Sequence, residues 1–264
     1  MTVMEGVNEH LRESLEYFQQ SRIVGIFLQG SQNYGLETEN SDIDTKLIVT
    51  PTFEDICFNR KAISTTHVRA NNEHVDWKDL RLMLTTFRKQ NLNFVEILFT
   101  QYKWLNPLYA DEWQRLIDNR EAIAHYNPYQ AVKTMKGIAL EKYHAMEHEY
   151  PSKIEIIRKY GYDCKQLHHL LRVEEYLTRY IQGESYEVCL RSRNPQYLKA
   201  VKQNLYSLED ARDHASIAFD YICDIADTFC EKTPNKGDPK VDELLDDVQR
   251  NIMRNALKME LEEK

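Results

Sequence analysis

Two short apolar segments, residues 22–29 (RIVGIFLQ) and 43–50 (IDTKLIVT), constrain the fold of this 264-residue chain more than any other feature. Both segments are rich in β-branched residues, and the first ends at Gly30, so each is typical of a strand within a sheet. A third segment, residues 65–77, has two extended pieces around a polar turn and predicts a hairpin. The sequence therefore predicts a sheet in the first part of the chain.

Helical patterns flank these strands and replace them after Pro107. Apolar residues recur at helical spacing in residues 7–18, and Asp79 precedes another helical segment as a plausible N-cap. Beyond Pro107 the strand patterns nearly vanish, and the long segments have helical periodicity. We therefore expect an α+β fold, in which residues 1–106 form a mixed sheet with flanking helices and residues 107–264 form an all-helical domain.

Composition and charge exclude several classes of protein. The formal net charge of −8 argues against a protein that binds along nucleic acid through an overall positive charge. No apolar run approaches the roughly 18–20 residues that span a bilayer, and the N-terminus has no pattern of a secretory signal. The five cysteines form no C-x-x-C pair, so we expect neither a disulfide framework nor a zinc site. The prediction is a globular cytoplasmic protein without a membrane partner.

The segment LQGSQNYGLETENSDID, residues 28–44, contains the parts of a phosphate-binding turn. Gly30 permits a tight turn and lets a ligand come close to the backbone. Ser31 offers a hydroxyl and an amide N–H at the start of a short predicted helix, residues 31–37. Such a helix start binds a phosphate readily.

Two carboxylates lie at the start of the second predicted strand. Asp42 and Asp44 are two residues apart, so both point to one face of that strand while Ile43 points into the core. Neighbouring carboxylates repel each other unless a cation lies between them, and Mg²⁺ (or Mn²⁺) also binds substrate phosphates. A phosphate site beside a metal site fits phosphoryl or nucleotidyl transfer. The alternative is a surface turn with a solvated acidic strand end.

These residues resemble the core motif of the DNA polymerase beta-like nucleotidyltransferase superfamily. Gly30-Ser31 and Asp42-Ile43-Asp44 match its pattern hG[GS]…Dh[DE]h, with eleven positions from Ser31 to Asp42. The fuller segment GSQNYGLETENSDID is similar to the form found in a predicted nucleotidyltransferase branch of the RNA repair pathway type. NFVEIL, GYDCKQLHHLLR and residues 182–211 resemble later blocks of that branch.

The resemblance covers most of residues 23–211 and implies both an activity and a nucleotidyltransferase-like sheet. It departs from the branch at residues 89–92, where KQNL stands in place of the usual Lys-Gly-Asn-Pro. The implied enzyme moves a nucleoside monophosphate from an NTP to an acceptor hydroxyl and releases pyrophosphate. An RNA 3′ end is the acceptor that the name of the branch favours, and a protein or a small molecule could use the same site.

The superfamily usually adds a third carboxylate on a neighbouring strand, as general base and metal ligand. Asp76 is the preferred candidate, because Val75 and Trp77 flank it in the pattern of a carboxylate that leaves a buried strand. Asp79 is the predicted helix cap and Glu73 lies near a turn, so these two acids are the alternatives.

A basic helix is the second region of interest. Lys165, His169 and Arg172 fall at spacings of four and three, so they can share one helix face. Such a face would hold the β- and γ-phosphates of the nucleotide, and the resemblance supports Lys165 and Arg172 in that role. The alternative is a solvated helix face with His168 turned into a core.

The leading hypothesis is therefore a Mg²⁺-dependent nucleotidyltransferase. Gly30 and Ser31 would bind the triphosphate, Asp42 and Asp44 would hold the metals, and Asp76 would help to activate the acceptor hydroxyl. A non-catalytic nucleotide- or RNA-binding module with the same fold is the first alternative. A structural helical interaction protein is the second, but it leaves the spacing of the two motifs unexplained.

Overall fold

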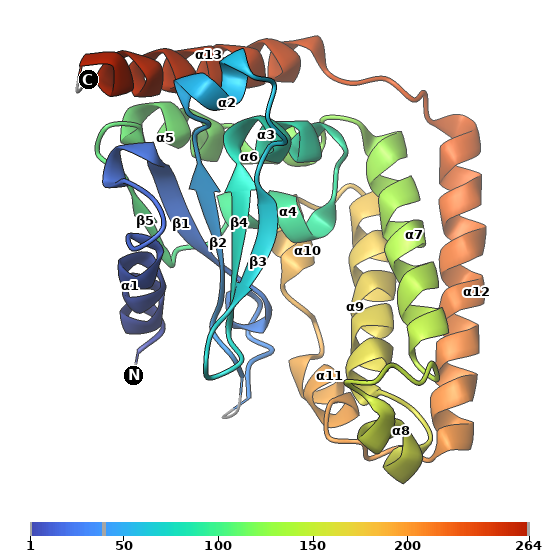
Figure 1. The fold of residues 1–264 in the computed structure, drawn as a ribbon. Coiled ribbons are helices and arrows are strands. Elements are labelled where there is room, and N and C mark those ends of the chain that lie inside the picture. Colours follow the sequence, from blue (N-terminus) through green and yellow to red (C-terminus); the bar gives the residue numbers. More distant parts are fainter. Residues whose placement is uncertain (1, 39–40, 263–264) are drawn as a thin grey trace. The chain divides into compact units, whose positions relative to one another are not determined.

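The structure is a computed structural model that describes residues 2–38 and 41–262 (Figure 1). The chain divides by internal packing into two compact units. Unit 1 comprises Met1–Asn33, Asn40–Tyr126 and Gly237–Lys264, and unit 2 comprises Tyr34–Glu39 and Asn127–Lys236.

The sheet of unit 1 has five strands in the order β3-β4-β2-β1-β5 (Figure 1). Their bounds are β1 Ile23–Gln29, β2 Asp44–Val49, β3 Ser64–Val68, β4 His74–Asp79 and β5 Lys103–Leu105. β1 pairs antiparallel with β2 and β5, β3 pairs antiparallel with β4, and β2 and β4 are parallel. The two predicted strands and the predicted hairpin are confirmed, and the sheet is mixed as expected.

The helices of unit 1 begin where their capping residues predict. In α1, Val3–Ser14, Thr2 and Glu5 form a capping box. In α3, Leu80–Arg88, the side chain of Asp79 accepts a hydrogen bond from the N–H of Arg81, which confirms the predicted N-cap. The other helices are α2 Phe53–Cys57, α4 Leu92–Val95, α5 Ala110–Asp118, α6 Arg120–Ala124, α13 Pro239–Glu262 and the 3₁₀ turns η1 Gln20–Arg22, η2 Ser31–Asn33 and η3 Glu96–Leu98.

The helix α1 covers one face of the sheet. Ile26, Leu28 and Leu47 point to that face, where Val7 of α1 and Ile43 complete a buried core. Burial of large aliphatic side chains on both elements holds the helix on the sheet.

Alternate residues of β1 and β2 point to the opposite face of the sheet. There Phe27 packs against Trp113 of α5, with ring centroids 4.9 Å apart. The helix α13 also belongs to this unit, since Arg88 and Arg115 form ion pairs with Asp242 and Asp247 at 2.7 Å. No pattern in the sequence indicated this packing of α13. The two packing units have other bounds than the predicted domains 1–106 and 107–264, and that division into domains stays a prediction.

Every regular element that the structure describes in unit 2 is a helix. The bounds are α7 Pro128–Ala145, α8 Ile154–Tyr160, α9 Cys164–Ile181, α10 Tyr186–Leu190, α11 Pro195–Val201 and α12 Leu208–Lys232. α7, α9 and α12 pack on one another. The predicted fold class, an α+β sheet region followed by a helical region, is confirmed. Within residues 2–38 and 41–262, no helix combines the length and the apolar character that crossing a membrane requires.

Candidate active site

The polar side chains of the candidate site lie on the sheet face opposite α1. The register places Gln29, the last residue of β1, opposite Asp44, the first residue of β2. Lys46 lies opposite Asp76 on the parallel strand β4. Because paired residues of neighbouring strands share a face, these four side chains gather on one face.

The Gly30-Ser31 turn follows β1 directly at this edge. Gly30 has a φ of +91°, which only glycine adopts without strain, and an added Cβ there would meet no atom within 4 Å. Its N–H donates to Glu96 Oε1 at 3.4 Å, and the following turn is held by Asn33, whose Nδ2 donates to the carbonyl of Leu28 at 3.0 Å. The open space beside the backbone leaves room for a ligand.

The predicted helix over residues 31–37 is wrong, because only Ser31–Asn33 form a 3₁₀ turn. Gly35 has a φ of +71°, which a right-handed helix does not contain. Ser31 is therefore the first residue of one turn and does not start a longer helix.

Replacing Gly30 by alanine should lower the free energy of unfolding by about 1–2 kcal/mol, because of the positive φ alone. Gly137→Ala is the matched control, since Gly137 also has open space around it but lies within the helix α7. That control should stabilise the protein by up to about 1 kcal/mol. Urea denaturation measures both, and equal effects of the two substitutions would refute the strain at Gly30.

Asp42 and Asp44 lie beside this turn. Gln32 Nε2 donates to the backbone carbonyl of Asp42 at 3.4 Å, which ties the turn to the acid pair. β2 begins at Asp44, so Asp42 is an exposed residue just before the strand, while Ile43 is buried as predicted. Asp44 is half-exposed, and its Oδ1 accepts hydrogen bonds from the N–H and Nδ1 of His74 at 2.9 and 3.1 Å. Among the described residues, none donates to Asp44 Oδ2.

Asp76 lies in the middle of β4 and is held by three side chains. Its Oδ1 accepts from Thr66 Oγ1 at 2.6 Å, and its Oδ2 accepts from Gln29 Nε2 at 3.1 Å and from Lys46 Nζ at 3.2 Å. Burial raises the pKa of this carboxyl, but the charge of Lys46 and the hydrogen bond from Thr66 outweigh burial and hold it below its usual value. Such a carboxylate is a weak base.

The two alternative third acids have structural partners. Asp79 is buried and forms an ion pair with Arg81 at 2.7 Å while it caps α3. Glu73 is buried, forms an ion pair with Arg69, and accepts hydrogen bonds from His10 Nε2 at 3.0 Å and from the N–H of Ile43 at 3.3 Å.

The buried pair His10 and Glu73 positions the acid pair from the other face of the sheet. His10 also bonds Thr45 Oγ1 through Nδ1 at 2.9 Å, and Glu73 holds the N–H of Ile43. These contacts fix the residues between and after Asp42 and Asp44. The sequence did not reveal this role, although a histidine in the apolar stripe of α1 was a signal of a buried polar partner.

In unit 2, the structure places the basic residues of α9 in different environments. Lys165 is exposed, His169 is half-buried, and Arg172 is buried with its guanidinium 3.6 Å from the centre of the Tyr34 ring. Burial and the neighbouring charges of His168 and Arg172 lower the pKa of His169 well below its usual value. His168 lies in the core, as the alternative interpretation expected, with Nδ1 2.8 Å from the carbonyl of Leu198.

Lys202, just after α11, extends this basic cluster. Its Nζ donates to the carbonyl of Leu36 at 3.0 Å. Burial and the neighbouring charges of Lys165 and Arg172 lower the pKa of Lys202 to about 8. The cluster therefore carries positive charges that repel one another, a condition that a bound anion would relieve.

The residues present fit a magnesium ion that arrives with phosphates. Within the described part of the chain, no group of three or more His, Cys, Asp or Glu side chains could hold a metal ion. Mg²⁺ is, however, commonly bound by one or two carboxylates together with substrate phosphates. Asp42 and Asp44, whose carboxylates keep oxygens that accept no hydrogen bond from the described residues, are the residues that would hold it.

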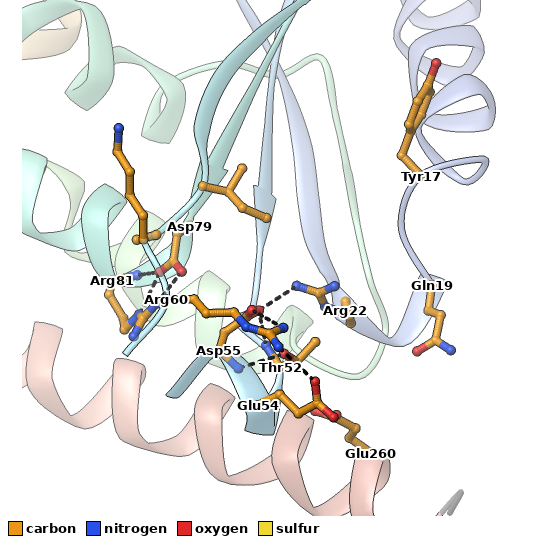
Figure 2. A pocket seen from close by; sticks show the side chains of 13 residues that line it. Tyr17, Gln19, Arg22, Thr52, Glu54, Asp55, Arg60, Asp79, Arg81 and Glu260 are labelled. Atoms are coloured by element: carbon orange, nitrogen blue, oxygen red, sulfur yellow. Dashed lines mark hydrogen bonds and ion pairs between the residues drawn. The ribbon is translucent and has the colours of Figure 1, made fainter. Parts of the chain in front are cut away.

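A cavity of about 610 Å³ lies at the opposite end of the strands. Figure 2 shows its charged lining, in which Arg22 and Arg60 point toward Asp55 and Arg81 pairs with Asp79. These residues lie where β1 begins and β4 ends, away from Gly30 and Asp44. Because its arginines already pair with carboxylates, we assign the cavity no part in the candidate site.

Comparisons with known proteins add little to this geometry. No protein-family model matches the chain, and no curated protein matches it. Among solved structures, the chain is similar to a nucleotidyltransferase-like protein from Exiguobacterium sibiricum 255-15. The two share 13% sequence identity and a TM-score of 0.31, over 87% of this chain and 77% of that chain. A likeness at that TM-score carries no conclusion about activity, which rests on the residues of this chain.

Proposed function

We propose that the chain is a Mg²⁺-dependent nucleotidyltransferase, which moves a nucleoside monophosphate from an NTP to an acceptor hydroxyl and releases pyrophosphate. One observation supports this best: the register of β1 and β2 sets Gln29 opposite Asp44. The Gly30 turn, which leaves room for a ligand beside its backbone, therefore lies next to the carboxylates of Asp42 and Asp44 at one end of the strands. Phosphate and metal sites must be adjacent for transfer at a phosphorus atom.

The residues of unit 1 would then divide the work. Asp42 and Asp44 would hold Mg²⁺ (or Mn²⁺), which neutralises charge on the phosphates. The backbone at Gly30 and the hydroxyl and N–H of Ser31 would donate to the triphosphate. Glu96 and Asn33 would keep that turn in place through the bonds described above.

The basic cluster of unit 2 would bind the β- and γ-phosphates through Lys165, His169 and Arg172. Its charge supports this role, because burial and the positive charges of Lys165 and Arg172 lower the pKa of Lys202 to about 8, and a bound phosphate would offset that repulsion.

A pH dependence follows from Lys202. The ammonium is present below about pH 8 and is lost as the pH rises through that value, so binding of inorganic tripolyphosphate should weaken over that range. Lys202→Arg keeps its charge at all these pH values and should remove the dependence. Isothermal titration calorimetry measures the affinity for tripolyphosphate at each pH. The same pH profile in both proteins would contradict a role for Lys202 in binding.

The acceptor is proposed to be an RNA 3′ end, with a protein hydroxyl or a small molecule as the other options. The test is incubation of the purified protein with each α-³²P-labelled NTP, Mg²⁺ or Mn²⁺, and candidate RNA or protein acceptors. Label that moves to an acceptor supports the enzyme. Tight nucleotide binding without transfer to any acceptor would instead indicate the non-catalytic module. A cytoplasmic location also stays a prediction.

A further inference from the structure

The three acids of the candidate site differ in how many hydrogen bonds their carboxylate oxygens accept from the protein. Asp76 receives hydrogen bonds on both oxygens, from Thr66 on one and from Gln29 and Lys46 on the other. In contrast, no described residue donates to the carboxylate of Asp42 or to Oδ2 of Asp44. A carboxylate has about four lone-pair sites. Three sites of Asp76 accept hydrogen bonds, whereas both sites of Asp44 Oδ2 and the carboxylate of Asp42 accept none from the described residues, so the acid pair is the more open to a cation.

The buried ammonium of Lys46 explains why Asp76 forms an ion pair. The Lys46 side chain is only 2% exposed, and its ammonium lies 3.2 Å from Asp76 and 4.1 Å from the centre of the Phe94 ring. A buried ammonium is strongly destabilising unless a carboxylate and further contacts compensate it. Asp76 supplies the negative charge, and Phe94 supplies the face of an aromatic ring.

Lys46 is also close to the acid pair in the fold. It follows Asp44 by two residues on β2, so both side chains project from the same face of the sheet. Its fixed positive charge reduces the repulsion between the neighbouring carboxylates while no metal is bound.

We infer that Asp76 is the counter-ion that positions Lys46 and is not a ligand of the metal, so that Asp42, Asp44 and the nucleotide phosphates hold the ion. This inference rests on the proposed function and replaces the base and metal role predicted for Asp76. Asp76 is thereby a positioning residue, which acts through the ammonium of Lys46.

Binding of Mn²⁺ together with a non-hydrolysable NTP analogue, followed by electron paramagnetic resonance, tests the metal part. Asp44→Ala should weaken Mn²⁺ binding by about tenfold or more. Asp76→Asn should leave it near the value of the parent protein. Asp55→Asn is the matched control, because it also removes the charge of an acid that pairs with basic side chains, here Arg22 and Arg60, but lies at the opposite end of the strands.

Thermal unfolding of a double-mutant cycle tests the pairing part. Asp76→Asn should lower the unfolding temperature, since it leaves the buried ammonium without its counter-charge. Adding Lys46→Met should restore most of the loss, because the pair is then replaced by a neutral amide and an apolar side chain. A merely structural loss at Asp76 would not be rescued by a second substitution.

The outcomes separate the two proposals. If the parent protein binds no Mn²⁺ with the nucleotide analogue, the proposed function fails. If the parent and Asp55→Asn bind Mn²⁺ but Asp76→Asn loses it as fully as Asp44→Ala does, the proposed function stands and the counter-ion inference is overturned. A double variant no more stable than Asp76→Asn alone would also overturn it.

Discussion

Replacing Asp42 and Asp44 together by alanine should reduce transfer of label from an α-³²P-labelled NTP by roughly 10³-fold or more. The two carboxylates are the only metal ligands that the proposal assigns to this chain, so the variant loses the ion that neutralises the phosphates. The fold should survive, because Asp42 is exposed and Asp44 is half-exposed. Initial rates at saturating NTP measure the loss, and circular dichroism with thermal unfolding checks the fold.

The matched control removes the same charge elsewhere. Asp220 and Asp224 are exposed acids of α12, and their double replacement by alanine should leave transfer unchanged. Transfer that continues at the parent rate in the Asp42→Ala/Asp44→Ala variant would remove the acid pair from the mechanism.

Replacing Glu73 by alanine should lower the free energy of unfolding by about 3–5 kcal/mol. Glu73 is buried, and it compensates the charge of Arg69, whose side chain is only 8% exposed, while it also bonds His10 and the N–H of Ile43. The variant leaves all three donors without this partner in the interior. Urea denaturation measures the change, and a loss below about 1 kcal/mol would show that Glu73 does not hold this network.

The same carboxylate makes the free energy of unfolding depend on pH. Burial raises the pKa of Glu73, but the hydrogen bonds from His10 and the N–H of Ile43 outweigh burial and lower it. A carboxyl whose pKa is lower in the folded protein than in the unfolded chain stabilises the folded state at pH values above its unfolded pKa of about 4.3. That contribution is lost as the pH falls through the pKa of the folded protein. Acid unfolding of Glu73→Gln, which preserves the shape of the side chain, should therefore be less steep below about pH 4.3 than that of the parent.

Local signals in the sequence predicted the parts of the fold that local physics decides. The β-branched run before Gly30 forms β1, and Asp79 starts α3, because strand preference and capping act within a few residues. Ile43 is buried between two acids because alternation along an extended chain needs no distant partner.

Contacts between distant segments were the part that the sequence could not predict. The strand β5 has only three residues and exists through its pairing with β1. The ion pair of Lys46 and Asp76 joins neighbouring strands, and α13 joins unit 1 through Asp242 and Asp247. Pattern reasoning finds acids and their spacing, but it does not show which acid a buried lysine neutralises.

The most direct test of the central claim is the anomalous scattering of Mn²⁺ in crystals grown with a non-hydrolysable NTP analogue. The proposal predicts a manganese peak within coordination distance of carboxylate oxygens of both Asp42 and Asp44, with the triphosphate against the N–H groups of Gly30 and Ser31. A nucleotide bound elsewhere, or a manganese peak that touches neither carboxylate, would contradict it.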